Sequence, residues 1–221
     1  MQIKRKIGLG MILLSILLLF TASVTFIPIA RIEKTIDFTI INPELPDLSL
    51  PGDLPIYLLK EMRNLKLAYP QWIWRDDPQY VILSLQPITK NPSFQQQTLE
   101  SPVKYHVYLE ARLELSVVRM ETGSSMIEAV DENQATQFSW KIRAEKSGRM
   151  SGNLWLFVNI TDSQSGKTWQ LTRFAVPLQI ESKDIFGLSL PLIRYFASIG
   201  FLIAFSAGLV LIFFKPRNVK K

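Results

Sequence analysis

The stretch Lys104-Tyr-His-Val-Tyr-Leu-Glu-Ala-Arg-Leu-Glu-Leu-Ser-Val-Val118 is the strongest local structural signal in the chain. Apolar side chains occupy every second position from Tyr105 to Val117, and most positions between them are polar or charged. Successive side chains of a strand point to opposite faces, so this alternation predicts a strand with one buried face. At ~3.3 Å per residue the strand would run for about 50 Å, so we expect a bend or bulge within it.

Further stretches on both sides have strand-like alternation or composition. They are Thr35–Ile41, Gln79–Gln86, Gln137–Arg143, Asn153–Thr161 and Thr168–Ile180. In the last, Trp169 and Leu171 share one parity while Phe174 and Val176 share the other, which predicts a β-bulge near Thr172–Arg173. Turn residues at 121–125, 146–148 and 162–166 separate the strands, and the last of these turns should close a hairpin.

Strands without long helices between them predict a mainly β fold, an antiparallel immunoglobulin-like β-sandwich over residues 56–184. Its first element is predicted as a short amphipathic helix, Ile56–Ala68, with Asp53 as N-cap and Pro70 as terminator. This helix would cover the sheet as a lid or, alternatively, lie on a membrane surface. Residues 30–55 are expected to form an extended strand followed by a proline-rich linker, Asn42–Pro55.

Two uncharged apolar runs, Ile7–Ile27 and Tyr195–Phe214, lie at the two ends of the chain. Runs of about twenty residues, at ~1.5 Å each, cross a hydrocarbon core of ~30 Å. We therefore predict an integral membrane protein with spans within residues 7–29 and 185–214, the second preceded by an interfacial segment. The first run exceeds the ~7–15 apolar residues of a cleaved signal peptide, which favours an uncleaved signal anchor.

The formal net charge of +6 belongs to the ends of the chain. All 19 acidic residues lie between Arg31 and Asp184. The terminal segments hold Lys4, Arg5, Lys6, Arg194, Lys215, Arg217, Lys220 and Lys221. The central segment is therefore close to neutral, at about −2, which argues against nucleic-acid binding.

Basic residues beside a span favour the cytoplasmic side of a membrane. We therefore expect a multi-pass protein of the plasma (cytoplasmic) membrane, with cytoplasmic tails at 1–6 and 215–221 and with residues 31–184 outside the cytoplasm. The chain has no cysteine, so its domain must fold without disulfides, and thiol catalysis and cysteine-ligated metals are excluded.

One part of the sequence resembles a known class of protein. The stretches Phe138-Ser-Trp-Lys-Ile142 and Leu154-Trp-Leu-Phe-Val158, with Gly148 and Gly152 between them and a span after them, are similar to the terminal strands of immunoglobulin-like modules tethered to bacterial membranes. The resemblance implies an adhesive or partner-binding module and carries no functional residues across.

Few residues suggest chemistry. His106 is the single histidine, and no Gly-x-Ser-x-Gly elbow accompanies it, so we expect a surface or cross-strand residue. The acidic pairs Asp76-Asp77 and Asp131-Glu132 lack calcium-loop spacing, and Ser165–Thr168 lacks the upstream glycine of a phosphate-binding loop. We therefore predict no catalytic residue, cofactor or metal, and no enzymatic activity.

Three groups remain as candidate contact sites. Trp72 and Trp74, followed by Arg75, would line a ligand groove, lie at the membrane interface, or pack onto the core. Arg194 and Tyr195 would anchor the second span at the outer headgroups. A small-residue stripe in that span, Gly200, Ala204 and Gly208, predicts close helix–helix contact, either with the first span or another copy, or with a different membrane protein.

These observations predict a membrane-anchored extracytoplasmic binding or accessory module that serves sensing, assembly or scaffolding. It would act through protein or envelope-ligand contacts outside and through helix contacts in the membrane. The alternative is an enzyme acting on envelope glycan or lipid with Asp76, Asp77 or Glu110 as acid or base, which requires two carboxylates converging in a cleft.

Overall fold

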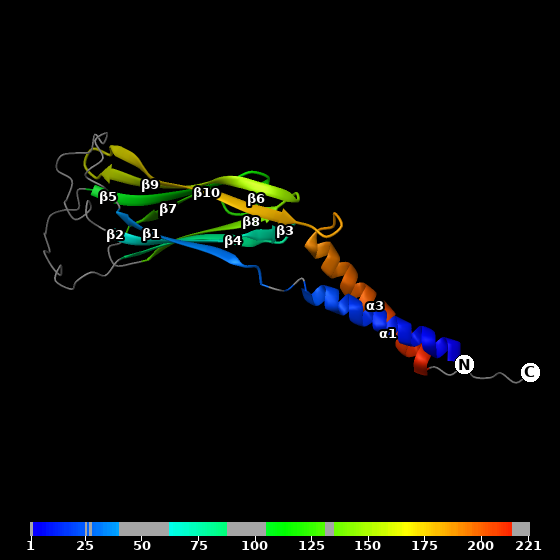
Figure 1. Ribbon diagram of the computed structural model, residues 1–221. Helices are drawn as coiled ribbons and strands as arrows, with labels where there is room; N and C mark the ends of the chain where they lie inside the picture. The colour runs from blue at the N-terminus through cyan, green and yellow to red at the C-terminus, as the bar shows by residue number, and fades with distance from the viewer. Residues whose placement is uncertain are drawn as a thin grey trace, which may run out of the picture.

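The computed structural model describes residues 2–24, 26, 28–39, 62–87, 105–130 and 135–213. Its elements are α1 (Gln2–Val24), β1 (Arg31–Thr39), β2 (Met62–Pro70), β3 (Trp72–Trp74), β4 (Gln79–Pro87), β5 (Tyr105–Leu115), β6 (Val118–Met120), β7 (Ser125–Ala129), β8 (Thr136–Ala144), β9 (Gly148–Asp162), β10 (Thr168–Lys183) and α3 (Leu190–Phe213). The strands form one elongated body, and the two helices leave it side by side from one end (Figure 1).

The β body consists of two sheets. Sheet A has the order β1-β2-β4-β8-β6, and sheet B has the order β3-β10-β9-β5-β7. Neighbouring strands are antiparallel except β3 and β10, which run parallel. The chain is therefore mainly β in two sheets, with a long apolar helix at each end.

The two sheets share one hydrophobic core. Alternate residues of each strand face this core, among them Leu83 of β4, Leu109 of β5, Trp140 of β8 and Leu156 of β9, all with 0% exposure. Burying each such side chain contributes roughly 1.5–3 kcal/mol, and the chain has no disulfide to assist it.

Most strands agree with the alternation in the sequence. β4, β8, β9 and β10 overlap their predicted stretches, and the hairpin between β9 and β10 is present. The register of β10 against β9 shifts between Thr172 and Phe174, which confirms the predicted bulge. The N-terminal stretch is also confirmed as β1, although the strand begins earlier, at Arg31.

The long strand bends, as expected, but it also changes sheets. β5 ends at Leu115 in sheet B, a turn follows at Ser116–Val117, and β6 continues in sheet A beside β8. Val117 has a φ of 59° within this turn. The core-facing residues change parity across this turn, from Leu115 in β5 to Val118 and Met120 in β6, while Val117 is exposed. The apolar Val117 extends the alternation of β5 in the sequence by one position and so hides the end of the strand.

The predicted helix over Ile56–Ala68 is wrong where the structure describes it, because residues from Met62 onward form β2. Leu65, Leu67 and Tyr69 are all buried with a period of two, and β2 pairs with strands on both sides. Tertiary pairing overrides the helical spacing of Met62 and Leu65. Residues 56–61 and the linker Asn42–Pro55 lie outside the described residues.

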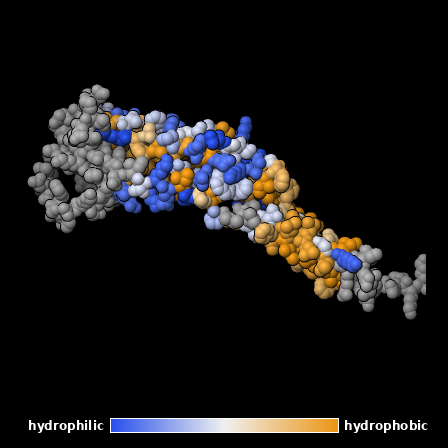
Figure 2. All heavy atoms as spheres, in the orientation of Figure 1, coloured by the Kyte–Doolittle hydropathy of each residue, from blue (hydrophilic) through white to orange (hydrophobic). Residues whose placement is uncertain are grey.

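Two helices are long and apolar enough to cross a membrane: Lys6–Ser23 within α1 and Leu190–Phe213. Figure 2 shows their hydrophobic surface in contrast to the largely hydrophilic β body. Pro191 occupies the first turn of α3, where its missing N–H costs nothing, so it begins the helix without a kink. α1 begins and α3 ends at the end of the pair furthest from the β body (Figure 1).

Candidate functional site

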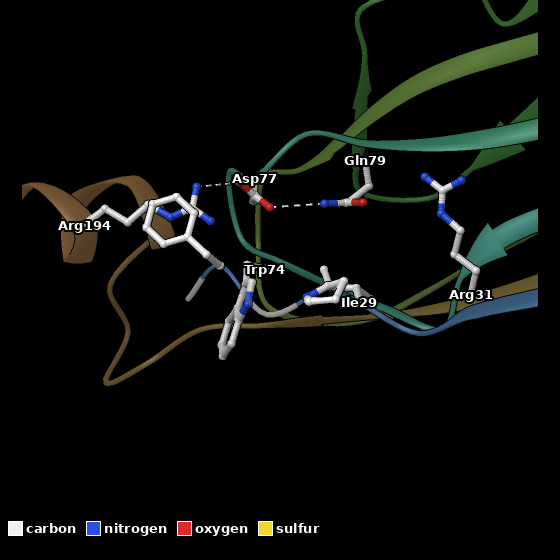
Figure 3. A pocket seen from close by; sticks show the side chains of 8 residues that line it. Ile29, Arg31, Trp74, Asp77, Gln79 and Arg194 are labelled. Atoms are coloured by element: carbon white, nitrogen blue, oxygen red, sulfur yellow. Dashed lines mark hydrogen bonds and ion pairs between the residues drawn. The ribbon is translucent and has the colours of Figure 1, made fainter. Parts of the chain in front are cut away.

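The β body meets the two helices at a junction built from three parts of the chain. One part is the loop that follows β3, another is the first turns of α3, and the third is the segment between α1 and β1 (Figure 3). These parts are far apart in the sequence. The junction therefore exists only in the folded chain.

An ion pair lies at the centre of the junction. Nη1 of Arg194, in α3, lies 3.2 Å from Oδ1 of Asp77, and Nε2 of Gln79 donates to Oδ2 of the same carboxylate at 3.2 Å. The side chains of Arg194 and Asp77 are 29% and 14% exposed. Partial burial reduces solvent screening and so strengthens the attraction between the two charges, while removing either partner would leave the other charge partly desolvated.

Arg194 also contacts the segment that follows α1. Its guanidinium carbon lies 4.5 Å from the centre of the Phe26 ring, which is within the range of a cation–π contact. One side chain thus connects α3, the β body and the chain leaving α1. Sequence reasoning assigned Arg194 to the membrane headgroups and did not find this role.

A backbone hydrogen bond attaches α3 to the β body as well. The N–H of Leu190, at the start of α3, donates to the carbonyl of Arg75 at 3.3 Å. The N–H of Gln71 donates to the carbonyl of Ala30 at 3.2 Å, which continues the pairing of β1 with β2 toward the segment that follows α1. Leu190 is also buried, at 1% exposure. The β body is therefore docked on the helix pair.

A pocket of about 270 Å³ opens beside the ion pair. Phe26, Ile29 and Trp74 supply its apolar lining, and Arg31 and Asp77 supply charges of opposite sign (Figure 3). Among the described residues that line this pocket, Asp77 is the single carboxylate, and its oxygens already accept hydrogen bonds from Arg194 and Gln79. The pocket does not bring together two carboxylates, which the enzymatic alternative requires.

The predicted tryptophan surface lies at this junction. The rings of Trp72 and Trp74 meet edge to face with their centres 5.1 Å apart, and both side chains are half-buried. Nζ of Lys183 lies 5.2 Å from the Trp72 ring centre. Arg75 lies 3.7 Å from Asp76 and 3.8 Å from Asp184, so its charge is balanced locally.

A second polar cluster lies on the face of sheet B that points away from the core. Glu110 accepts hydrogen bonds from Arg112 at 2.9 Å, Ser125 at 2.8 Å, Asn159 at 3.2 Å and Gln170 at 2.9 Å. Its residue exposure is 7%. These donors come from β5, β7, β9 and β10 and therefore connect four strands of the sheet.

The pKa of Glu110 is lowered by this environment. Burial acts to raise the pKa, but the hydrogen bonds from Ser125, Arg112 and Asn159, with the charge of Arg112, outweigh burial. A carboxylate held ionised in this way is a poor general acid. A shallow groove lined by Tyr108, Ile127 and Gln170 lies over the same face.

The small-residue stripe of α3 lies against α1. A Cβ placed on Gly208 would lie 2.9 Å from Cγ1 of Ile12 and 3.1 Å from the carbonyl oxygen of Gly8. A Cβ on Gly200 would lie 3.1 Å from Cδ1 of Leu18, and Ala204 is 5% exposed. The two backbones therefore approach each other where the small residues recur.

The other candidates form no reactive arrangement in the described part of the chain. His106 is exposed, with its ring centre 6.5 Å from that of Tyr108. Ser165–Thr168 belongs to the hairpin between β9 and β10, while Asp131 and Glu132 lie outside the described residues. Among the described residues, no group of three His, Cys, Asp or Glu could hold a metal ion.

Known proteins give little further information about this chain, which is a two-sheet β body with two apolar helices. No family model matches the sequence, and no curated protein matches it. A chain from a complex of zinc 2-glycoprotein and prolactin inducible protein from human seminal plasma is 10% identical. The match has a TM-score of 0.32 and covers 52% of this chain and 88% of that one.

A FixG-related protein from Vibrio parahaemolyticus is also 10% identical. This match has a TM-score of 0.22 and covers 70% of this chain and 97% of that one.

Proposed function

We propose that this protein is a two-span membrane protein that presents its β body outside the cytoplasm as a binding or accessory module. In this role it serves sensing, assembly or scaffolding. The observation that carries the proposal is the junction at Arg194, where one side chain contacts both Asp77 and Phe26. A body docked in this way keeps a fixed orientation to the bilayer, as a module that positions a partner requires.

The distribution of charge supports the orientation. The tails beyond the helices carry basic residues, whereas all the acidic residues lie between Arg31 and Asp184. α1 begins and α3 ends at the same end of the helix pair, so a bilayer around the pair would hold both tails on one side. This arrangement accounts for a plasma-membrane protein with cytoplasmic termini.

We also propose that the β body is immunoglobulin-like. The order β2-β4-β8-β6 in sheet A corresponds to strands A-B-E-D of that fold, and β10-β9-β5 corresponds to G-F-C. β2 and β3 are consecutive, yet β2 pairs with β4 in sheet A and β3 pairs with β10 in sheet B. β1, next to β2, and β7, next to β5, are additional strands in this comparison.

Binding is favoured over catalysis by the state of the two best-placed carboxylates. Asp77 is occupied by Arg194 and Gln79, and Glu110 is occupied by four donors. The groove beside Glu110 combines the exposed side chain of Ile127 with amide and phenol groups, which suits a polar ligand or a partner protein.

Crosslinking in native membranes tests this function. A photoreactive residue at Ile127 should give a specific crosslinked product, and Arg194→Gln should reduce its yield because the body no longer holds one orientation. Glu121→Gln, which removes an exposed carboxylate bonded to Lys141 and Arg143, serves as the matched control and should leave the yield unchanged. Absence of a product, or an equal yield with Arg194→Gln, would contradict the proposal.

A further inference from the structure

A two-residue turn joins β10 to α3 and presents a phenylalanine at its tip. The N–H of Leu188 donates to the carbonyl of Ile185 at 3.0 Å, and the reverse bond is 3.4 Å long. Both central residues have left-handed backbone angles, with φ of 54° for Phe186 and 74° for Gly187. This geometry favours Asn-Gly or Asp-Gly, so a phenylalanine at the first position is conformationally costly.

Packing against the described residues does not compensate for that cost. Phe186 is 97% exposed, more than any other large hydrophobic residue in the described part of the chain. Leu188, on the same turn, is 42% exposed. The turn therefore presents apolar surface that the described residues do not cover. Leu192 and Tyr195 nearby in the sequence are also exposed, so Phe186 belongs to a group of exposed apolar side chains, which is the kind of surface that marks an interaction site.

The surroundings of the turn indicate a lipid surface. No charged residue occurs from Ile185 to Ile193, and Asp184, just before the turn, lies 3.8 Å from Arg75. Leu192 and Tyr195 in the next helical turns are 44% and 60% exposed. Figure 2 shows hydrophobic surface continuing from the helix pair to the adjoining end of the β body.

The length of α3 places the turn at the membrane boundary. The part of α3 after Arg194, from Tyr195 to Phe213, is about 28 Å long at ~1.5 Å per residue and therefore fills a hydrocarbon core of ~30 Å. Arg194 then lies at the edge of the core. In the proposed topology, the first turn of α3 and the preceding turn Ile185–Leu188 then fall in the headgroup region.

We propose that the turn Ile185–Leu188 inserts Phe186 into the outer-leaflet interface of the bilayer as a third membrane anchor. This inference rests on the proposed two-span topology. A single ring and one leucine offer far less area than the ~800 Å² per partner of a stable protein interface, whereas the lipid beside α3 is already present. With the two helices, this third contact sets the tilt of the β body.

The absence of cysteine makes spin labelling direct. The full-length Phe186→Cys protein is labelled, reconstituted into phosphatidylcholine/phosphatidylglycerol vesicles, and tested for collisions with oxygen and with a water-soluble nickel chelate. The label should be accessible to oxygen and protected from nickel several-fold relative to a label at Gln164→Cys, an exposed position in the hairpin between β9 and β10. Equal nickel accessibility at the two positions would overturn the inference.

A label at Ile203→Cys, in the middle of α3, separates this inference from the proposed topology. If Ile203 is protected from nickel and Phe186 is not, the third anchor alone fails. If Ile203 is also exposed to nickel, the spanning helix itself fails. Protection of Phe186 from both nickel and oxygen would indicate a protein contact and would contradict a lipid site.

A second variant tests the effect on tilt with the label placed away from the turn. Phe186→Asn suits the left-handed backbone better, so the β body should remain folded. A label at Lys146→Cys, in the exposed loop between β8 and β9, reports on the orientation of the body. Phe186→Asn should change the nickel accessibility of the label at Lys146→Cys several-fold, and an unchanged value would show that Phe186 does not set the tilt.

Discussion

Arg194 of α3 donates a hydrogen bond to the carboxylate of Asp77 at 3.2 Å, although 117 positions separate the two residues in the sequence. Asp77 belongs to the β body, in the loop between β3 and β4. The pair therefore links the body to the helix that we propose crosses the membrane. Because Arg194 also contacts Phe26, the link extends to the segment after α1.

Removing the charge of Arg194 should loosen the junction. Arg194→Gln should cost about 1–2 kcal/mol of docking free energy, since it removes a half-buried, charge-assisted hydrogen bond and leaves Asp77 partly desolvated. Spin labels at Gln164→Cys and Ile203→Cys would report the distance between body and helix. Its distribution should broaden in Arg194→Gln and stay narrow in Glu121→Gln.

Asp77→Asn provides an internal check of the same pair. If the two side chains act as a unit, the distance distribution between the two labels should be no broader in the Arg194→Gln/Asp77→Asn double variant than in either single variant. Fully additive broadening would show that each residue acts through a different contact.

Glu110 should make the stability of the β body dependent on pH. Glu110→Gln keeps the shape of the side chain but removes the ionised acceptor, so we expect a loss of about 1–3 kcal/mol at pH 7 in urea unfolding. The folded-state pKa is lowered from 4.5, so the contribution of the carboxylate is fully present above 4.5. It is lost as the pH falls through the lower folded-state value.

The wild-type protein should therefore lose more stability than Glu110→Gln when the pH is lowered from 7 to about 3. Other carboxylates titrate in both proteins, so the difference between the two curves isolates Glu110. Parallel curves would contradict the role assigned to this residue.

Close packing of the two helices should depend on Gly208. Gly208→Leu would place side-chain atoms against Ile12 and the backbone of Gly8, which should destabilise the pair by about 1–3 kcal/mol. Gly10→Leu is the matched control, because a Cβ there has nothing within 4 Å. Thermal unfolding in detergent should show a lower midpoint for Gly208→Leu only, and equal midpoints would refute this packing.

The sequence predicted those parts of the fold that local patterns encode. Alternation identified β4, β8, β9 and β10, and the change of parity in β10 located the bulge at Thr172–Phe174. The apolar positions also change parity between Val117 and Val118, but a change of parity does not distinguish a bulge from a crossing to the other sheet, so it could not show that the chain leaves sheet B after Leu115. The helix predicted over Ile56–Ala68 failed because β1 and β4 pair with β2 from elsewhere in the sequence.

The candidate site was harder to predict from the sequence than the strands were. Arg194 was identified as unusual because of its place at the edge of an apolar run, and Asp77 was noted as one of two adjacent acids. Their pairing depends on how α3 meets the β body, which no local pattern records. Glu110 was similarly one charge in an alternating strand, although its position opposite the core-facing residues was a usable signal for a cross-strand network.

Labelling of Gln164→Cys in intact cells with a membrane-impermeant maleimide tests the central claim most directly, with Lys220→Cys in the basic tail as the reference. A β body outside the cytoplasm predicts labelling of Gln164→Cys without permeabilisation and of Lys220→Cys only after it. The reverse result, in which Lys220→Cys reacts in intact cells and Gln164→Cys does not, would contradict the account.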